Sequence, residues 1–253
     1  MKTFKKITLF GVLFLLFTLF SLKTSAQIYT LSSNINIDWQ VVNSYTPPFY
    51  EGKALAGESS SIKAIASVEV MTPVGTLDPS KLFYAWRYND YYSHIYSKTG
   101  GNIIYFTLDD LQSTNVLELK VYENNRQENL LAEKIIRISP RKSEAILYRK
   151  NNNPIITYSN AINKRFQNYE VYPNETFDIL AEPYYFSVKN PKENKLSYVW
   201  SVNGIPGNTN YTNTFSYKAP GTSFRDFGIG LKIENSTQIL QSSESLLNFI
   251  LIK

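Results

Sequence analysis

The sequence has no cysteine and a single histidine, His94, among its 253 residues. These absences exclude disulfide bonds, thiol catalysis, cysteine-based zinc sites and metal centres that need several histidines. A serine triad would have to use His94 as its base, but no Gly-x-Ser-x-Gly motif occurs. Because His94 lies among tyrosines in a polar stretch, we interpret it as a solvated loop residue.

Charged residues are scarce and nearly balanced. They make up 19% of the chain, and the formal net charge of +5 depends on four lysines in the first 26 residues, which contain no acidic residue. Without that segment, 22 basic residues stand against 21 acidic ones. A chain so close to neutrality has no electrostatic footprint for nucleic acid.

Clustered acidic residues are equally rare. Asp109-Asp110 is the adjacent acidic pair of the first half of the chain, and leucines flank it. We interpret it as a turn rather than as the paired carboxylates of a glycoside hydrolase. No Asp-x-Asp-x-Asp run is present to supply oxygen ligands for calcium. The sequence therefore predicts no catalytic residue, no metal site and no cofactor.

One long apolar run is present, at residues 7–22. Three lysines precede it within the first six residues, and Thr24-Ser25-Ala26 follows it with small side chains. This order of regions predicts a secretory signal peptide at 1–26 and an exported chain. The run is shorter than the ~20 apolar residues that span a bilayer, which favours cleavage. The chain would contact the membrane only through this leader, and only if the leader were not cleaved.

Aromatic residues are abundant, at 15% of the chain, and they mark a repeat. Lys81–Asp90 returns 114 residues later as Lys195–Gly204, and both read Lys-Leu-x-Tyr-[Ala/Val]-Trp-x-x-Asn-[Asp/Gly]. Large apolar residues alternate along each copy, which is the period of a strand with one buried face, and a turn follows. The predicted structural core residues are Tyr84, Trp86, Tyr198 and Trp200.

Other alternating segments recur in the same order at offsets near 107–114 residues, which chance seldom produces at four places. We therefore predict two copies of one β module, at 27–141 and 142–253. The further strands expected span residues 35–41, 62–70, 103–107, 117–122 and 130–138 in the first module, and 145–148, 177–181, 214–217, 229–233 and 246–252 in the second.

The two tryptophan strands, each followed by Asn and then Asp or Gly, resemble the Tyr-x-Trp strand and turn of PKD-type domains. Ala219-Pro220-Gly221-Thr222 resembles the Pro-Gly-Thr entry to a later strand of that family. Arg87 and Ser201 depart from its pattern, so the resemblance is to Ig-like or PKD-like sandwiches without cysteine. It implies an all-β fold of two tandem immunoglobulin-like antiparallel β-sandwiches.

Two further segments, Tyr45–Leu55 and Ala181–Ser187, are similar to segments of uncharacterised exported two-module proteins of candidate-phylum bacteria. That group has no activity to transfer. The motifs behind both resemblances specify a fold rather than a site.

The candidate binding residues are Tyr91, Tyr92 and Tyr96, which follow the first tryptophan strand in a polar connection. Tyrosine combines apolar area with a hydroxyl, so exposed tyrosines stack on sugars or anchor protein partners. The alternative is that they cover the end of a sheet. Tyr184-Tyr185-Phe186 is a weaker candidate because it extends an alternating strand. Three Asn-x-Ser/Thr sequons would be surface positions in a host that glycosylates, at Asn174, Asn210 and Asn235.

Three hypotheses about function follow. The first is a non-catalytic protein of the cell surface or periplasm that acts as a structural spacer or in adhesion, with another surface protein as its partner, for instance in a pilus-type assembly. The second is an exported carbohydrate-binding protein that uses the loop tyrosines. The third, an exported hydrolase, has the least support from the residues.

Overall fold

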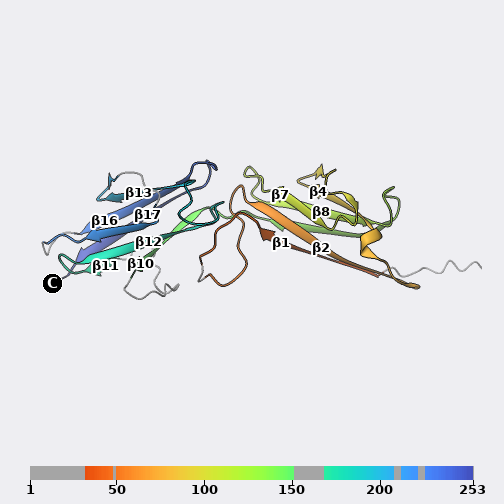
Figure 1. The fold of residues 1–253 in the computed structure, drawn as a ribbon, viewed down its shortest axis with the longest axis horizontal. Coiled ribbons are helices and arrows are strands. Elements are labelled where there is room, and N and C mark those ends of the chain that lie inside the picture. Colours follow the sequence, from red (N-terminus) through yellow and green to blue (C-terminus); the bar gives the residue numbers. More distant parts are fainter. Residues whose placement is uncertain (1–31, 48–49, 151–167, 208–211, 222–225, 253) are drawn as a thin grey trace, which may run out of the picture.

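The computed structural model describes residues 32–47, 50–150, 168–207, 212–221 and 226–252. Their regular structure is β-strand, apart from one 3-10 turn, η1, at Pro79–Lys81. They form two β-sandwiches that lie end to end (Figure 1). The predicted leader and the sequon at Asn210 lie outside the described residues. No helix in the described ranges is long and apolar enough to cross a bilayer.

The first sandwich packs two sheets against each other. In one sheet, β2 lies between β1 and β7 and also pairs with β3; in the other, the order is β5-β4-β8-β9, with β6 also paired to β4. Apolar residues from both sheets share one core. The strands are β1 (Ser32–Val41), β2 (Ser61–Thr72), β3 (Gly75–Thr76), β4 (Phe83–Tyr88), β5 (Tyr91–Tyr92), β6 (Lys98–Thr99), β7 (Ile103–Thr107), β8 (Asn115–Tyr122) and β9 (Leu130–Ile138).

The second sandwich repeats this plan. One sheet has the order β10-β12-β15, and the other has the order β11-β17-β16-β13-β14. The ladders between its strands are antiparallel except for that between β11 and β17. The strands are β10 (Glu144–Lys150), β11 (Asn168–Val171), β12 (Thr176–Tyr184), β13 (Leu196–Val202), β14 (Ile205–Pro206), β15 (Thr214–Lys218), β16 (Phe227–Asn235) and β17 (Ser242–Leu251).

The strand order confirms the immunoglobulin-like fold class. In such sandwiches, strands A, B and E form one sheet and strands C, F and G form the other. Here β1, β2 and β7 stand opposite β4, β8 and β9, and β10, β12 and β15 stand opposite β13, β16 and β17. Every strand expected from the alternation is present, with ends shifted by a few residues. The division at 141/142 stays a prediction; β9 ends at Ile138 and β10 begins at Glu144.

Matching hydrogen bonds fix the same register in both sandwiches. Ala66 N donates to the Asn102 carbonyl at 2.8 Å, and Ala181 N donates to the Asn213 carbonyl at 2.7 Å. Each bond joins the second strand to the start of the E strand. The two copies therefore share their strand pairing as well as their sequence pattern.

The four predicted core residues are all buried. Trp86 is 0% exposed and Trp200 is 3% exposed, each on an interior strand of its sheet. The two tyrosines have equivalent bonds as well as equivalent places: the Tyr84 hydroxyl donates to the Pro79 carbonyl at 3.2 Å, and the Tyr198 hydroxyl to the Pro191 carbonyl at 2.6 Å. Each ring is thus buried while its polar end is satisfied.

The polar connection after Asn89 contains two short strands that the sequence did not indicate, β5 and β6, both paired to β4. The expectation for one sequon was wrong. The sequon at Asn235 is not a surface position. That side chain is buried, accepts hydrogen bonds from the amide and hydroxyl of Thr237, and donates to Gln241. Asn174 is exposed, as expected.

Replacing Trp86 or Trp200 by alanine should lower the free energy of unfolding by about 3–5 kcal/mol, because a large buried ring leaves a cavity that the sheets cannot close. Urea denaturation followed by circular dichroism measures this loss. Trp39→Ala is the control, since Trp39 is only partly buried at the edge of the first core. A loss at Trp86 no larger than that at Trp39 would contradict the prediction.

Candidate binding sites

Each tryptophan strand is followed by a hairpin of the same type. Asn89 and Asp90 have φ of 44° and 68°, and Asn203 and Gly204 have φ of 51° and 78°. Positive φ at both central residues is the signature of a type I′ turn, which asparagine and glycine favour. The Asn203 side chain accepts from Gly228 N at 2.8 Å, as Asn89 accepts from Val116 N at 2.8 Å. Each asparagine therefore ties its hairpin to the neighbouring F strand.

The three predicted binding tyrosines, in and after the first hairpin, differ in how far they are exposed to solvent. Tyr91 is 80% exposed, whereas Tyr92 is half-buried and meets the exposed His94 edge-on at 4.8 Å between ring centroids. Tyr96 packs on the core and lies 6.2 Å from the ring of Tyr105. Only Tyr91 therefore offers most of its ring to solvent, and a binding role for the three together stays a prediction.

Sequence analysis missed two exposed apolar side chains near these tyrosines. Ile95 lies in the loop after β5 and is exposed, and Tyr105 on β7 is partly covered by the Lys63 ammonium at 5.8 Å from its ring. The alternation of β7 places Tyr105 on the outer face, opposite the buried Ile104, and that signal was readable in the sequence. Nothing in the local sequence marks Ile95.

The weaker candidates lie elsewhere. Tyr184 and Phe186 are buried, and Tyr185 is half-buried with a φ of 65°. Asp109 accepts from Leu111 N at 3.0 Å, as expected for a turn, and Asp110 accepts from the amide and hydroxyl of Ser59. These acids are engaged in holding loops together.

The second hairpin borders a cavity that no sequence motif indicated. The cavity has a volume of about 390 Å³ and is lined by Trp200, Phe215, Val202, Asn203, Ile205, Pro206 and Gly207. Ile205 is 74% exposed and takes the place that Tyr91 has in the first hairpin. The Phe215 ring stacks on the indole of Trp200, with centroids 5.0 Å apart and planes at 12°.

The Trp200 indole differs from its counterpart in one hydrogen bond. Trp86 Nε1 donates to the carbonyl of Gly101 at 2.7 Å, whereas Trp200 Nε1 is buried and has no partner among the described residues. A buried donor without a partner is costly, and most buried polar groups avoid that state. The two sandwiches therefore differ, within the residues that the structure describes, in how the indole N–H is satisfied.

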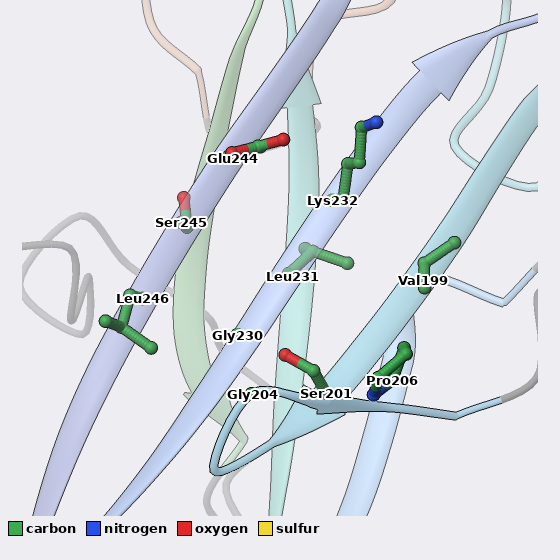
Figure 2. A pocket seen from close by; sticks show the side chains of 10 residues that line it. All are labelled: Val199, Ser201, Gly204, Pro206, Gly230, Leu231, Lys232, Glu244, Ser245 and Leu246. Atoms are coloured by element: carbon green, nitrogen blue, oxygen red, sulfur yellow. The ribbon is translucent and has the colours of Figure 1, made fainter.

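A second hollow, of about 380 Å³, lies on the outer face of the same sheet (Figure 2). Gly230 forms its floor between Ser201 and Leu246, because a side chain there would collide with the Ser201 hydroxyl. The Lys232 ammonium, 2.8 Å from Glu234, lies at one end. The lining is mixed and includes no aromatic ring or buried unsatisfied group, so the hollow indicates no particular ligand.

A buried acid lies where the two sandwiches meet. Glu182 on β12 is 5% exposed, and its Oε2 has no partner among the residues that the structure describes. The hydroxyl of Tyr45 from the first sandwich hydrogen-bonds its carboxyl group. Burial raises the pKa of Glu182 to about 7, and the bond from Tyr45 offsets only part of that effect. Burial, followed by the nearby Glu182 carboxylate, also raises the pKa of Tyr45 and of Tyr198.

Comparison with known proteins identifies no function for these sites. No family model matches the chain, and no curated protein matches it. Among solved structures, the chain is similar to fibronectin(III)-like modules of CbhA from Clostridium thermocellum, with 12% identity over 86% of this chain and 94% of that one, and a TM-score of 0.28.

It is also similar to three N-terminal domains of the outer capsid protein Hoc of bacteriophage RB49 and to the glucan-utilisation protein SGBP-B of Bacteroides ovatus. The identities are 16% and 12%, and the TM-scores are 0.37 and 0.25. The matches cover 88% and 84% of this chain but only 59% and 47% of those chains. Likenesses this distant carry no ligand or activity across, and the fold assignment stands on the strand order.

The stability of the chain should fall as pH rises from about 4.5 to about 7. In this window the folded chain keeps a proton on Glu182 that the unfolded chain releases, so unfolding is favoured by each increase in pH. The full effect is about 3 kcal/mol, since each tenfold change in acidity corresponds to about 1.4 kcal/mol. Urea denaturation at pH 4.5 and 7.5 measures it.

Glu182→Gln should remove this pH dependence, because glutamine keeps the shape of the side chain and does not titrate. Glu144→Gln, an exposed carboxyl on the adjacent strand, is the control and should leave the dependence in place. An unchanged pH profile in Glu182→Gln would exclude Glu182 as its cause.

Proposed function

We propose that the chain is an exported, non-catalytic protein of the cell surface or periplasm in which two Ig-like modules, 27–141 and 142–253, form one rigid spacer. Its hairpins and loops present contacts to a protein partner, in adhesion or in a surface or pilus-type assembly. The observation that carries the proposal is the interlocked junction between the two sandwiches.

Main-chain contacts hold the connection between the two sandwiches to the first sandwich. Gly57 forms a parallel bridge with Arg141, and Arg141 N donates to the Ala56 carbonyl at 2.8 Å. Gly57 also lies directly against the carbonyl of Tyr185, so that any side chain at this position would overlap that oxygen. A glycine is required here because two backbones approach closely.

A single glutamine links the junction to the interior of the second sandwich. Gln241 Nε2 donates to the Glu58 carbonyl of the first sandwich and to Ser187 Oγ at 2.8 Å. Its Oε1 accepts from Ser187 N at 2.8 Å and from Asn235 Nδ2 at 2.9 Å. Because all these groups are fixed within the second sandwich, the bond to Glu58 supports a fixed angle between the two sandwiches.

Aromatic packing adds to the same junction. The ring of Tyr50 meets that of Tyr184 edge-on at 6.1 Å, and Tyr45 packs against the second core. The segment between β1 and β2 therefore connects two strands of the first sandwich, but it packs against the second sandwich. Linked sandwiches usually move relative to one another unless such an interface restrains them.

Gly57→Ala should open the junction, because its methyl group would overlap the Tyr185 carbonyl. We expect a larger maximum dimension in small-angle X-ray scattering and a loss of about 1–3 kcal/mol in stability, as for overpacked interiors. Gly207→Ala is the matched control, since a methyl group there makes only an ordinary contact. Scattering curves that do not differ between Gly57→Ala and Gly207→Ala would argue against a rigid spacer.

The second candidate is carbohydrate binding through the tyrosine hairpin. The exposed ring of Tyr91 favours it, because an accessible aromatic face can stack on a sugar ring. Tyr92 and Tyr96 are partly covered and would contribute ring edges and hydroxyl groups. The same exposed ring also serves a protein contact, so the two candidates need an experiment to separate them.

A glycan array performed with the protein and with Tyr91→Ala/Tyr92→Ala separates them. Carbohydrate binding predicts retention of a glycan class by the protein and at least about tenfold weaker retention by the variant, since removing two stacking rings removes most of the contact. Tyr122→Ala, a half-buried tyrosine at the far end of the same sheet, is the control. Absence of any retained glycan would remove this candidate and leave the spacer.

A further inference from the structure

We propose that the loop between β16 and β17 docks the chain on an anionic lipid surface, with Ile239 and Leu240 inserted among the lipids. Lysines of the loop between β12 and β13 lie at the headgroups. We call residues 236–241 the tip loop and residues 185–195 the lysine loop. This contact does not involve the predicted leader, and it does not rest on the spacer function, because both loops belong to the second sandwich.

The tip loop exposes two consecutive aliphatic side chains. Ile239 is 93% exposed and Leu240 is 52% exposed. The loop can be followed in Figure 1 at the junction end of the second sandwich, where β16 ends and β17 begins. Aliphatic residues that are exposed singly need no explanation, whereas neighbouring ones form apolar surface that a partner can cover. The tip loop therefore offers such surface at a projecting point.

Hydrogen bonds within the tip loop fix this exposed arrangement. Asn235 N donates to the Gln241 carbonyl at 3.0 Å and closes the loop at its base. Gln241 N donates to the Gln238 carbonyl at 2.9 Å, and Thr237 N donates to Asn235 Oδ1 at 3.0 Å. The exposure of the two aliphatic side chains thus follows from a bonded loop shape that holds them away from the core.

The lysine loop lies against the tip loop. Ser236 N donates to the Lys195 carbonyl at 2.8 Å, and Ser187 N donates to Gln241 Oε1 at 2.8 Å. Three lysines of this loop are exposed and form no ion pair with a described acidic side chain: Lys189, Lys192 and Lys195. Glu193 is the one acid in the two loops, so they carry a net positive charge.

An apolar tip beside lysines matches an anionic lipid surface. Aliphatic side chains enter the boundary between headgroups and acyl chains, and lysines gain from the negative surface potential. The long lysine stems let the ammonium groups stay at the headgroups while the tip is inserted. Lipids also conform to a projecting tip, whereas a protein partner would need a pocket of matching shape. With two aliphatic side chains inserted, the binding is weak and reversible.

The first sandwich offers a contrast to the tip loop. Leu111, in the loop between β7 and β8, is 91% exposed, yet it directly follows Asp109-Asp110. These acids lie across the junction from the tip loop, because Asp110 bonds Ser59 and the adjacent Glu58 carbonyl accepts from Gln241. Negative charge beside Leu111 opposes an anionic surface. The lipid contact is therefore assigned to the second sandwich, and Leu111 is the matched control.

The test is flotation with unilamellar vesicles of the chain from Gln27 onward, so that the apolar run at 7–22 cannot contribute. The probe vesicles contain equal parts of phosphatidylcholine and phosphatidylglycerol, and vesicles of phosphatidylcholine alone are the control. We expect saturable binding to the anionic vesicles and at least about tenfold weaker binding to the neutral ones, because the lysines lose their attraction. Raising the salt from about 0.1 M to about 1 M shortens the Debye length from about 10 Å to about 3 Å and should weaken binding to a similar extent.

One pair of variants tests the inserted side chains. Ile239→Asp/Leu240→Asp should weaken binding to anionic vesicles at least about tenfold, since it removes the apolar contact and adds negative charge. Leu111→Asp adds a charge at an equally exposed leucine and should leave binding unchanged. All three positions are exposed, so the melting temperature, followed by circular dichroism, should stay the same in both variants.

A second pair of variants tests the lysines. Lys192→Glu/Lys195→Glu should weaken binding at least about tenfold, because two favourable charges become unfavourable. Lys134→Glu/Lys218→Glu changes the net charge by the same amount at exposed positions on β9 and β15. This control should leave binding unchanged, which separates a local contact from a general effect of net charge.

Three results would overturn the proposal. The chain would fail to bind the anionic vesicles, or would bind the neutral ones equally well. The tip and lysine variants would bind as the unaltered chain does, or their controls would lose as much binding as they do. Sedimentation without lipid would show self-association that Ile239→Asp/Leu240→Asp abolishes, which would assign the tip loop to a second copy of this chain.

Discussion

The burial of one tryptophan between two sheets is the interaction on which each sandwich depends. Without cysteine, no disulfide crosses either core, so the sheets are held by apolar packing around Trp86 and Trp200. A buried indole supplies a large apolar area but also carries an N–H that has to be satisfied. The first sandwich meets both demands, whereas in the described part of the second sandwich the indole N–H has no acceptor.

The junction sets a different constraint on the second sandwich. Its sheet β10-β12-β15 would have one face in water in an isolated module, yet Tyr148, Glu182 and Tyr184 on that face are buried. Tyr45 and Tyr50 from the first sandwich supply part of the cover. The acid is stabilised there mainly in its protonated form, because the site offers it hydroxyl groups and no cation among its described neighbours. The contact between the sandwiches is therefore chemically linked to the protonation state of one side chain.

The alternation of apolar residues was sufficient to predict the long strands, the repeat and the four buried aromatic residues, because these features depend on neighbours two residues apart. It could not predict β5, β6 or the burial of Asn235, which depend on segments that return from elsewhere in the chain. Glu182 shows the limit most clearly. It lies between Ala181 and Pro183 in an alternating strand, so its position indicates the solvent face, whereas in the structure it is buried and Tyr45 from the first sandwich contacts it. Of the candidate tyrosines, the pattern likewise could not distinguish the exposed Tyr91 from the partly covered Tyr96.

A boundary drawn between β9 and β10 divides the sequence but not the packing. The loop that follows β1 covers the second sandwich, and Gln241, near the start of β17, holds the Glu58 carbonyl with the same amide that orders Ser187 and Asn235. An isolated second sandwich would lose the Glu58 acceptor and expose Glu182 together. The two repeated modules therefore share contacts at the junction, and they differ at their hairpins, where the first has an exposed tyrosine and the second an exposed isoleucine. Function is expected where the copies differ, since their shared residues are occupied in holding the cores.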